Sequence, residues 1–359
     1  MADKKQKIIT GIIVLILAVS IVLVAMLLRG KTSLETPTTN TTIGMGTVVV
    51  ESFYCKDSGV SDQAIKKATE IINDLDRNKL SWREKTSEIY ALNNAGSGTL
   101  SKVTYDCLST CIDISKNCGG ALDVTVGPLS GLWNIGTNEA RVPSDAEIDE
   151  ALPRINFERI SLDSTSDKFA VSIGDDQRLD LGAVGKGLAC DVIRDYVKST
   201  TIVGGTVSVG GSILVYGENP TSKDKTWNVG VRNPFGNDSD YMAVINCSPC
   251  CISTSGDYEK VLEINGKKYH HILNPKTGYP AESQITGVTI VADSGIVTDA
   301  LSTACFILGY SDESLALLEK YNANAIFVMK DKTVYITDGI KSHVTIVDDS
   351  FKLGSEVAA

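Results

Sequence analysis

The sequence predicts an α+β fold, built largely from antiparallel sheets with covering helices and preceded by one N-terminal transmembrane helix. Glycine-bounded β-like runs dominate the second half of the chain, and no regular alternation of strands and helices persists. With 359 residues and 43% apolar content, the chain can build a large core. Its formal net charge of −10, with scattered Lys and Arg residues, argues against nucleic acid as the main partner.

The N-terminus carries an uncharged, almost wholly apolar run over residues 8–28. At about 1.5 Å per residue this run can cross a hydrocarbon core of roughly 30 Å. A cleaved signal peptide is the alternative, but its apolar region usually has about 7 to 15 residues, and the small-x-small sequence at 18–20 lies inside the run. Three lysines precede the run, whereas Arg29 and Lys31 follow it. We therefore expect a cytoplasmic segment over 1–7 and an uncleaved anchor over 8–28.

The segment after the anchor is polar and rich in threonine. Residues 29–43 contain little that could be buried, so we expect a linker there. From Gly44 onward the chain shows no internal repeat and no second low-complexity stretch. Residues 44–359 are therefore expected to form one globular unit.

The first half of this unit alternates between short β-like and helical stretches. Residues 44–55 are expected as a strand, and 61–79 as a helix because apolar positions recur at helical spacing after a Ser/Asp cap. A second helix is expected over 101–120, ending on glycine. A strand that runs into a loop follows at 121–136, and a short helix with Pro and an acidic first turn follows at 141–155.

The second half contains six β-like runs. Two helical stretches at 297–309 and 311–322 interrupt this pattern, and a hairpin at 325–337 follows. The six runs lie at 168–174, 206–216, 226–232, 244–254, 259–265 and 285–291.

Three glycines and Lys186 lie in the segment 179–193, between an apolar run that resembles a strand and one typical of a helix. The spacing G-x-x-G-x-G fits neither a dinucleotide-binding turn nor a P-loop. Glycine content alone favours a tight turn where the backbones of a helix and a strand pass closely.

Asp299 and Thr303 lie four residues apart at the head of a predicted helix. This spacing places a carboxylate and a hydroxyl on one helix face. Two hard oxygen ligands suit Mg²⁺ better than a soft metal. The alternative is an acidic residue that interacts with the helix dipole beside a threonine bonded back to its own helix.

Two of the three histidines in the chain, His270 and His271, are adjacent and precede a dense turn signal at 274–280. Neighbouring residues on a strand face opposite ways, so both cannot enter one site, and we expect one of them to face solvent. A histidine before a rigid turn could orient a substrate or transfer a proton.

The nine cysteines show no compact disulfide framework. The run 247–251, with the sequence CSPCC, has one C-x-x-C step but no second pair and no nearby histidine, which argues against zinc and leaves the state of Cys247, Cys250 and Cys251 open. Cysteines in apolar helical segments are expected as buried free thiols, and these are Cys107, Cys111 and Cys190.

Nine sequence blocks in a fixed order resemble the ApbE family of FAD:protein FMN transferases, also called flavin transferases. The resemblance covers roughly residues 44–340 and implies a fold like that of ApbE proteins. The blocks are MGT at 45–47, LSWREKTSEIYALN at 80–93, ALDVTVGPLSGLW at 121–133, LDLGAVGKG at 179–187, VSVGGSI at 207–213, VRNP at 231–234, ISTSGDYE at 252–259, HILNPKTGYP at 271–280 and TDALSTA at 298–304.

The resemblance also implies roles for particular residues. The metal ligands it implies are the Ala183 carbonyl, Asp299, Ser302, which stands where some members have an acid, and Thr303. The catalytic residues it implies are His271, Asp299 and Lys186. The positions that it implies line the flavin nucleotide are Met45, Trp82, Ala121, Leu122, Asp123, Asp180, Lys186, Gly256 and Leu273.

The implied reaction moves FMN from FAD onto a Thr or Ser hydroxyl of an acceptor protein through a phosphoester bond, and it releases AMP. Mg²⁺ and Lys186 would offset phosphate charge, and His271 or Asp299 would accept the proton of the hydroxyl. One alternative is an FAD pyrophosphatase that gives FMN and AMP. The other is a non-catalytic, membrane-anchored flavin-binding protein.

The predicted anchor and the resemblance together imply a location. We expect a single-pass protein of the cell membrane with its N-terminus inside and its catalytic domain outside the cytoplasm. The implied partner is an acceptor protein of a membrane electron-transport complex. A linker of this length spans about 20 Å, so the acceptor should lie near the membrane.

Overall fold

The computed structural model describes residues 34–165 and 168–354. The predicted cytoplasmic segment 1–7 and anchor 8–28 lie outside the described residues. In the two described ranges, no helix combines the length and the apolar character that crossing a bilayer requires.

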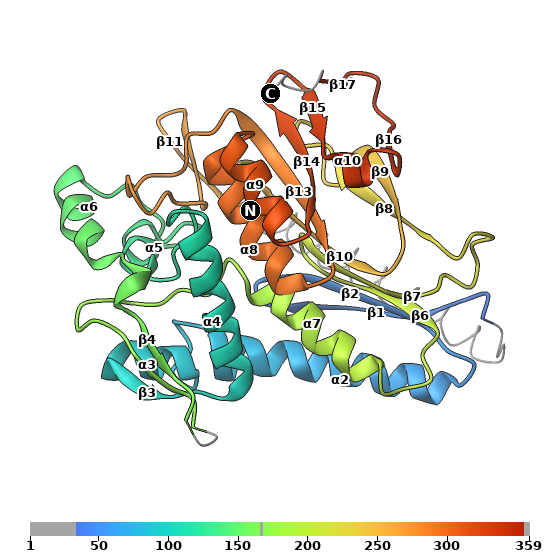
Figure 1. The fold of residues 1–359 in the computed structure, drawn as a ribbon, viewed down its shortest axis with the longest axis horizontal. Helices are drawn as coiled ribbons and strands as arrows, with labels where there is room; N and C mark the ends of the chain where they lie inside the picture. The colour runs from blue at the N-terminus through green and yellow to red at the C-terminus, as the bar shows by residue number, and fades with distance from the viewer. Residues whose placement is uncertain (1–33, 166–167, 355–359) are drawn as a thin grey trace, which may run out of the picture.

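A nine-stranded sheet organises the fold (Figure 1). Every strand pair in this sheet is antiparallel except β15 with β17, so the predicted antiparallel α+β fold is confirmed. In spatial order the strands are β1 Thr38–Gly44, β2 Thr47–Tyr54, β6 Gly204–Val209, β7 Ser212–Gly217, β10 Cys250–Gly256, β13 Ile285–Ala292, β14 Asn324–Met329, β15 Thr333–Ile336 and β17 Lys352–Leu353.

Both faces of the sheet are covered where its central strands lie. Helices pack on one face, and a three-stranded sheet packs on the other through a second apolar cluster. All eight residues of β13 are consequently buried. The helices on the first face are α2 Ser58–Asp74, α7 Gly185–Val197, α8 Gly295–Leu308 and α9 Asp312–Lys320, with α4 Lys102–Asn117 against α8 (Figure 1). The small sheet contains β16 Val344–Ile346, β9 Tyr241–Cys247 and β8 Trp227–Arg232.

A smaller lobe lies beside α4, at the left of Figure 1, where α5 and α6 pack together. The buried Trp133 indole donates a hydrogen bond to the Gly278 carbonyl at 2.8 Å, which ties α5 to the turn after His271. The remaining elements are a π-helical turn Leu75–Leu80, α3 Glu88–Ala95, β3 Ser97–Thr99, α5 Gly127–Trp133, α6 Asp145–Ala151, 3₁₀ turns Leu152–Arg154 and Phe157–Arg159, β4 Ser161–Asp163, β5 Ala170–Ser172, β11 Val261–Ile264, β12 Lys267–His270 and α10 Asp338–Lys341.

Of the predicted helix ends, the glycines after α4 and the acidic first turn of α6 are confirmed, whereas the predicted Ser/Asp cap of α2 is wrong because that helix begins three residues earlier, at Ser58. The Asp57 carboxylate accepts a hydrogen bond from the Gly59 amide and begins α2. A capping box between Ser144 and Glu147 begins α6. Two glycines with positive φ angles follow α4, at Gly119 and Gly120.

The predicted linker over 29–43 is wrong for Thr38–Ile43, which lie in β1. This segment pairs with β2 along its whole length, from Thr38 opposite Phe53 to Gly44 opposite Thr47. Its polar composition reflects an edge strand with alternate residues exposed, and β-branched threonine suits that position.

The predicted strand at 121–136 is also wrong. The Asp123 carboxylate accepts hydrogen bonds from the Thr125 amide at 2.8 Å and the Thr125 hydroxyl at 2.6 Å, which closes a turn before α5. No strand precedes the glycine-rich loop either, because in the described chain Arg178 makes only an isolated bridge with Val126.

Two predicted β-like runs each contain two strands. The run 206–216 turns at Gly210 and Gly211, between β6 and β7. The run 244–254 breaks at Ser248 and Pro249, between β9 and β10.

Candidate functional site

The N-termini of α7 and α8 meet through two glycines. A Cβ atom added to Gly187 would lie 1.9 Å from the Gly295 carbonyl oxygen, and one added to Gly295 would lie 2.2 Å from the Gly187 carbonyl oxygen. Only glycine permits this approach. The prediction of a close backbone contact is thus confirmed, but the contact joins two helices rather than a helix and a strand. We call this region the helix junction.

Each helix of the junction is capped by a carboxylate of the other. The Gly187 amide in the first turn of α7 donates to Asp299 Oδ2 at 2.6 Å. In return, Asp191 of α7 accepts hydrogen bonds from the amides of Gly295 at 2.7 Å and Ile296 at 2.9 Å, in the first turn of α8. These bonds satisfy amides that have no partner within their own helices, and they place negative charge at both helix N-termini.

Asp299 is held in one orientation. Its side chain is nearly inaccessible, with 2% relative exposure, and Oδ1 accepts hydrogen bonds from the hydroxyls of Ser212 and Ser253, both at 2.6 Å. Together with the Gly187 amide, three donors fix the carboxylate. The alternative in which Asp299 serves its own helix dipole does not describe this geometry, because its amide partner belongs to α7.

The other predicted metal ligands lie near the Asp299 carboxylate, either on the same helix or at the start of α7. Thr303 follows one helical turn later and is half-buried. The Ser302 hydroxyl donates to the Asp299 carbonyl at 2.9 Å and lies 2.8 Å from the Ser255 hydroxyl. Ala183 precedes the first turn of α7, and within the described ranges its carbonyl oxygen accepts no backbone hydrogen bond, since the Gly187 amide donates to Asp299 instead.

Charged side chains surround the approach to the junction. We call Arg83, Asp180, Lys186, Glu259 and Lys260 the charged rim. In the part of the chain that the structure describes, the ammonium groups of Lys186 and Lys260 make no hydrogen bond and no ion pair. Burial raises the pKa of Glu259, and the positive charges of Lys186 and Arg232 oppose that rise. Burial and then the charge of Lys186 lower the pKa of Lys260.

The outer part of the rim is linked to Trp82. The Arg83 guanidinium lies 3.8 Å from the centre of the Trp82 ring, a cation–π contact. Asp180 accepts a hydrogen bond from the Gly182 amide at 2.8 Å, and its charge raises the pKa of Arg83 against the larger effect of burial. The structure thus brings the predicted positions Trp82, Asp180 and Lys186 to one rim.

His271 lies against this rim in a defined tautomer. Its Nδ1 lies 3.0 Å from the Glu259 carbonyl oxygen, which can only accept, so Nδ1 carries the proton and Nε2 is left as an acceptor. Burial, followed by the charge of Lys260, lowers the pKa of His271 to about 4. The ring is therefore neutral at neutral pH.

His270 faces the other way, as strand alternation predicts. Its Nε2 lies 3.0 Å from the Ala281 carbonyl oxygen, and its ring meets the edge of Phe306 at 5.4 Å between centroids. Both histidines are half-buried, so the expectation that one faces solvent is wrong. The cause is packing: α8 and the segment after β12 cover the side that would otherwise be open.

Several predicted flavin positions serve the fold in ways that the structure shows. The Asp123 carboxylate is engaged by Thr125 and by the Phe157 amide at 3.0 Å. Met45 occupies the β1–β2 turn with a φ of 50°. Leu273 belongs to the core of the α5–α6 lobe, Gly256 ends β10, and Ala121 and Leu122 are buried. Their contact with a flavin remains a prediction.

Sequence reasoning missed the side chains that complete the site. Ser212 and Ser253 lie within two of the sequence blocks, yet nothing local indicates that they face Asp299. Lys260 directly follows the block ISTSGDYE, and its φ of 44° is an unusual backbone conformation for lysine.

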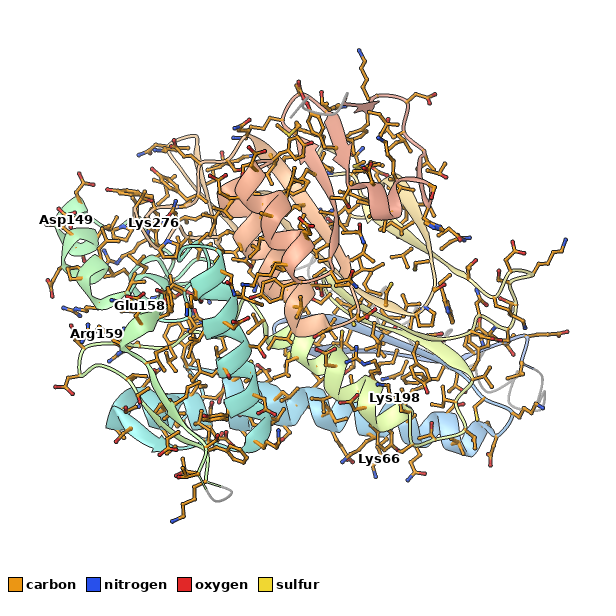
Figure 2. All side chains as sticks on the ribbon, viewed as in Figure 1. Lys66, Asp149, Glu158, Arg159, Lys198 and Lys276 are labelled. Atoms are coloured by element: carbon orange, nitrogen blue, oxygen red, sulfur yellow. The ribbon has the colours of Figure 1, made fainter. Side chains whose placement is uncertain are left out.

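Basic side chains also lie away from the site. Figure 2 labels the exposed Lys66 on α2 and Lys198 at the end of α7, which lie near each other, and the exposed Lys276 beyond β12, on the opposite side of the view.

Comparison with known proteins extends these observations. The model of the ApbE family matches residues 45–327. An FAD:protein FMN transferase of Treponema pallidum is 34% identical over 293 residues, which are 76% of this chain and 79% of the relative. One of Klebsiella pneumoniae is 26% identical over 316 residues, covering 86% of this chain and 94% of the relative.

Two solved structures share the fold. The ApbE protein of Thermotoga maritima has a TM-score of 0.78 and 26% identity, covering 86% of this chain and 99% of that one. The flavin transferase ApbE of Vibrio cholerae has a TM-score of 0.72 and 24% identity over the same shares.

Proposed function

The chain belongs to the ApbE family, and from that premise we propose that it is an FAD:protein FMN transferase whose helix junction and charged rim carry out the transfer. The enzyme moves FMN from FAD onto a Thr or Ser hydroxyl of an acceptor protein by a phosphoester bond and releases AMP. One observation carries this proposal: the Asp299 carboxylate is fixed by three donors, and one of them, the Gly187 amide, directly follows Lys186, whose charge has no partner among the described residues.

The rim supplies binding energy for the pyrophosphate of FAD. The ammonium groups of Lys186 and Lys260 lie at the site and form no ion pair with any described residue, so an anionic substrate need not displace such a partner when it binds. The N-terminus of α7, next to Lys186, adds the positive end of a helix dipole. These positive charges stabilise the bound pyrophosphate and also the negative charge on the AMP that leaves.

The junction fits Mg²⁺ as a cofactor. We propose that Asp299, the Ala183 carbonyl and Thr303 hold the ion, with Ser302 as a further oxygen on the same helix. The donor set fits because all its atoms are hard oxygens, and because Asp299 Oδ2 accepts a single hydrogen bond from the residues that the structure describes. When bound, the ion would stabilise charge on the phosphate oxygens.

His271 is the residue that we assign as general base. Its neutral ring presents Nε2 as an acceptor, so it can take the proton of the acceptor hydroxyl as the oxygen attacks the FMN-side phosphorus. The new O–P bond forms while the bond from phosphorus to AMP breaks, and Lys186 offsets the charge on the leaving group. Asp299 is the weaker candidate for a base because three donors already engage its oxygens.

We further propose that the protein is anchored by residues 8–28, with its catalytic domain outside the cytoplasm. The apolar run and the excess of lysines before it support this topology. Because β1 begins at Thr38, only residues 29–37 separate the anchor from the fold, and nine extended residues reach at most about 30 Å. The acceptor would then be a membrane-bound electron-transport protein with its flavin site close to the bilayer.

The test uses the full chain in detergent with FAD, Mg²⁺ and a candidate acceptor domain, and it follows the acceptor mass together with free AMP. We expect an acceptor heavier by one FMN phosphoester and an equal amount of AMP, both lost in Asp299→Asn. AMP and free FMN with an unchanged acceptor, across several candidate domains, would favour the hydrolytic alternative. Bound FAD without any AMP would favour a flavin-binding protein.

A further inference from the structure

The C-x-x-C step at Cys247 and Cys250 lies where the chain passes between the two sheets. Cys247 is the last residue of β9 in the small sheet, and Cys250 is the first residue of β10 in the nine-stranded sheet. Only Ser248 and Pro249 connect them. The two cysteines therefore sit at the ends of one sharp crossing.

The two thiols interact with each other. A side-chain hydrogen bond joins them, and it lowers the pKa of Cys247 while it raises that of Cys250. Both are half-buried at the edge of the second apolar cluster. Two hydrogen-bonded thiols separated by a two-residue connection form an arrangement that can close to a disulfide.

Cys251 does not join this pair. Its sulfur lies 3.9 Å from Asp191 Oδ1 and 3.8 Å from Arg194 Nη1, on the face of β10 toward the helix junction. Among the described residues, no group of three or more His, Cys, Asp or Glu side chains could hold a metal ion. The local chemistry is that of a dithiol rather than that of a zinc site.

We propose that Cys247 and Cys250 form a thiol–disulfide exchange site that closes to an intramolecular disulfide when it meets a small-molecule disulfide. The Cys247 thiolate attacks one sulfur of the external disulfide, which releases one thiol and leaves a mixed disulfide. Cys250 loses its proton and attacks Cys247 Sγ, and the second thiol leaves. Two S–H bonds are exchanged for one S–S bond, and the external disulfide is reduced to two thiols.

The test exposes the reduced full chain, in its native state, to oxidised glutathione and analyses it by intact mass and peptide mapping. We expect the wild type to lose two hydrogens, with Cys247 linked to Cys250. Cys250→Ser should retain one glutathione on Cys247, whereas Cys247→Ser should form no link. Cys55→Ser is the matched control, because this half-buried thiol lies elsewhere, 3.4 Å from the Thr201 carbonyl oxygen.

A second measurement needs no variant. Brief alkylation of the reduced wild type under native conditions should label Cys247 before any of the six buried cysteines. A wild type that keeps glutathione on either cysteine without closing, or that keeps both thiols free while a reference dithiol peptide oxidises, would overturn the proposal.

Discussion

The helix junction and the charged rim adjoin each other along the chain, at Gly187 and Lys186, yet they are built in opposite ways. In the junction, backbones touch, glycines leave no space, and backbone amides and hydroxyls hold both capping carboxylates in place. At the rim, Lys186 and Lys260 keep their charge without a partner in the described chain. On the proposed function, this difference is a division of labour: the junction holds the Asp299 carboxylate in one orientation before substrate binds, and the rim keeps its positive charge for the substrate.

The largest effect should come from His271, which lies against the rim. Replacing it with Asn keeps a donor for the Glu259 carbonyl but removes the base, so we expect the transfer rate to fall by roughly 100-fold or more. The free energy of unfolding should change by less than about 1 kcal/mol. Stopped assays of AMP release and urea unfolding measure the two quantities. His270→Asn is the control, and an equal loss of rate in that variant would contradict the assignment.

In contrast to His271→Asn, the substitution Gly187→Ala should lower the stability of the fold, because the new methyl group would clash with the Gly295 backbone. We expect the free energy of unfolding to fall by about 3 kcal/mol, measured in urea. Gly131→Ala on α5 is the matched control, since a Cβ there meets no atom within 4 Å. A Gly187→Ala protein as stable as the control would show that the junction is not rigid.

Ser212→Ala removes one of the two hydroxyls that orient Asp299. If the junction holds Mg²⁺, the concentration needed for half-maximal transfer should rise about 10- to 100-fold, because orienting hydrogen bonds tune metal affinity. A Mg²⁺ titration of the transfer rate measures this shift. Ser208→Ala on β6, whose hydroxyl bonds to Gly210 instead, should leave the titration unchanged.

The smallest effect should come from Lys260→Gln. The positive charge of Lys260 helps to lower the pKa of His271 to about 4, so its removal should raise that pKa toward the ordinary value of 6.5. The neutral base is then lost at a higher pH, and the acid limb of kcat/KM should move upward by about one pH unit or less. Lys268→Gln on β12, an exposed lysine, is the control. An unchanged acid limb of kcat/KM in Lys260→Gln would show that the charged rim does not set the pKa of His271.

Helix periodicity and the acidic first turn of α6 could be predicted because their causes are local. The cap of α2 was misplaced, since Asp57 lies before the apolar stripe that predicts the helix. The spacing of Asp299 and Thr303 predicts two hard oxygen ligands, and that role stays a prediction. The donors that fix Asp299 could not be predicted, since Gly187 is 112 residues away along the chain and Ser212 is 87 residues away.

The errors had equally physical causes. The apolar residues at 121–136 are buried by a turn and a short helix, and a short apolar run does not distinguish these from a strand. Thr38–Ile43 looked like a linker because an edge strand with one exposed face needs few apolar residues. A lysine such as Lys260 is a residue type common on any protein surface, and only the fold brings it near Lys186 and His271.

The exchange of caps between α7 and α8 also has a consequence for biosynthesis. Asp191 and the Gly295 amide are 104 residues apart, which a ribosome adds in roughly 5 to 20 s. A nascent chain that ends before α8 has an uncapped α7 and lacks Asp299, the carboxylate to which we assign the metal. The enzyme therefore becomes active only after most of its polypeptide has been made, and flavin cannot be consumed by an unfinished copy.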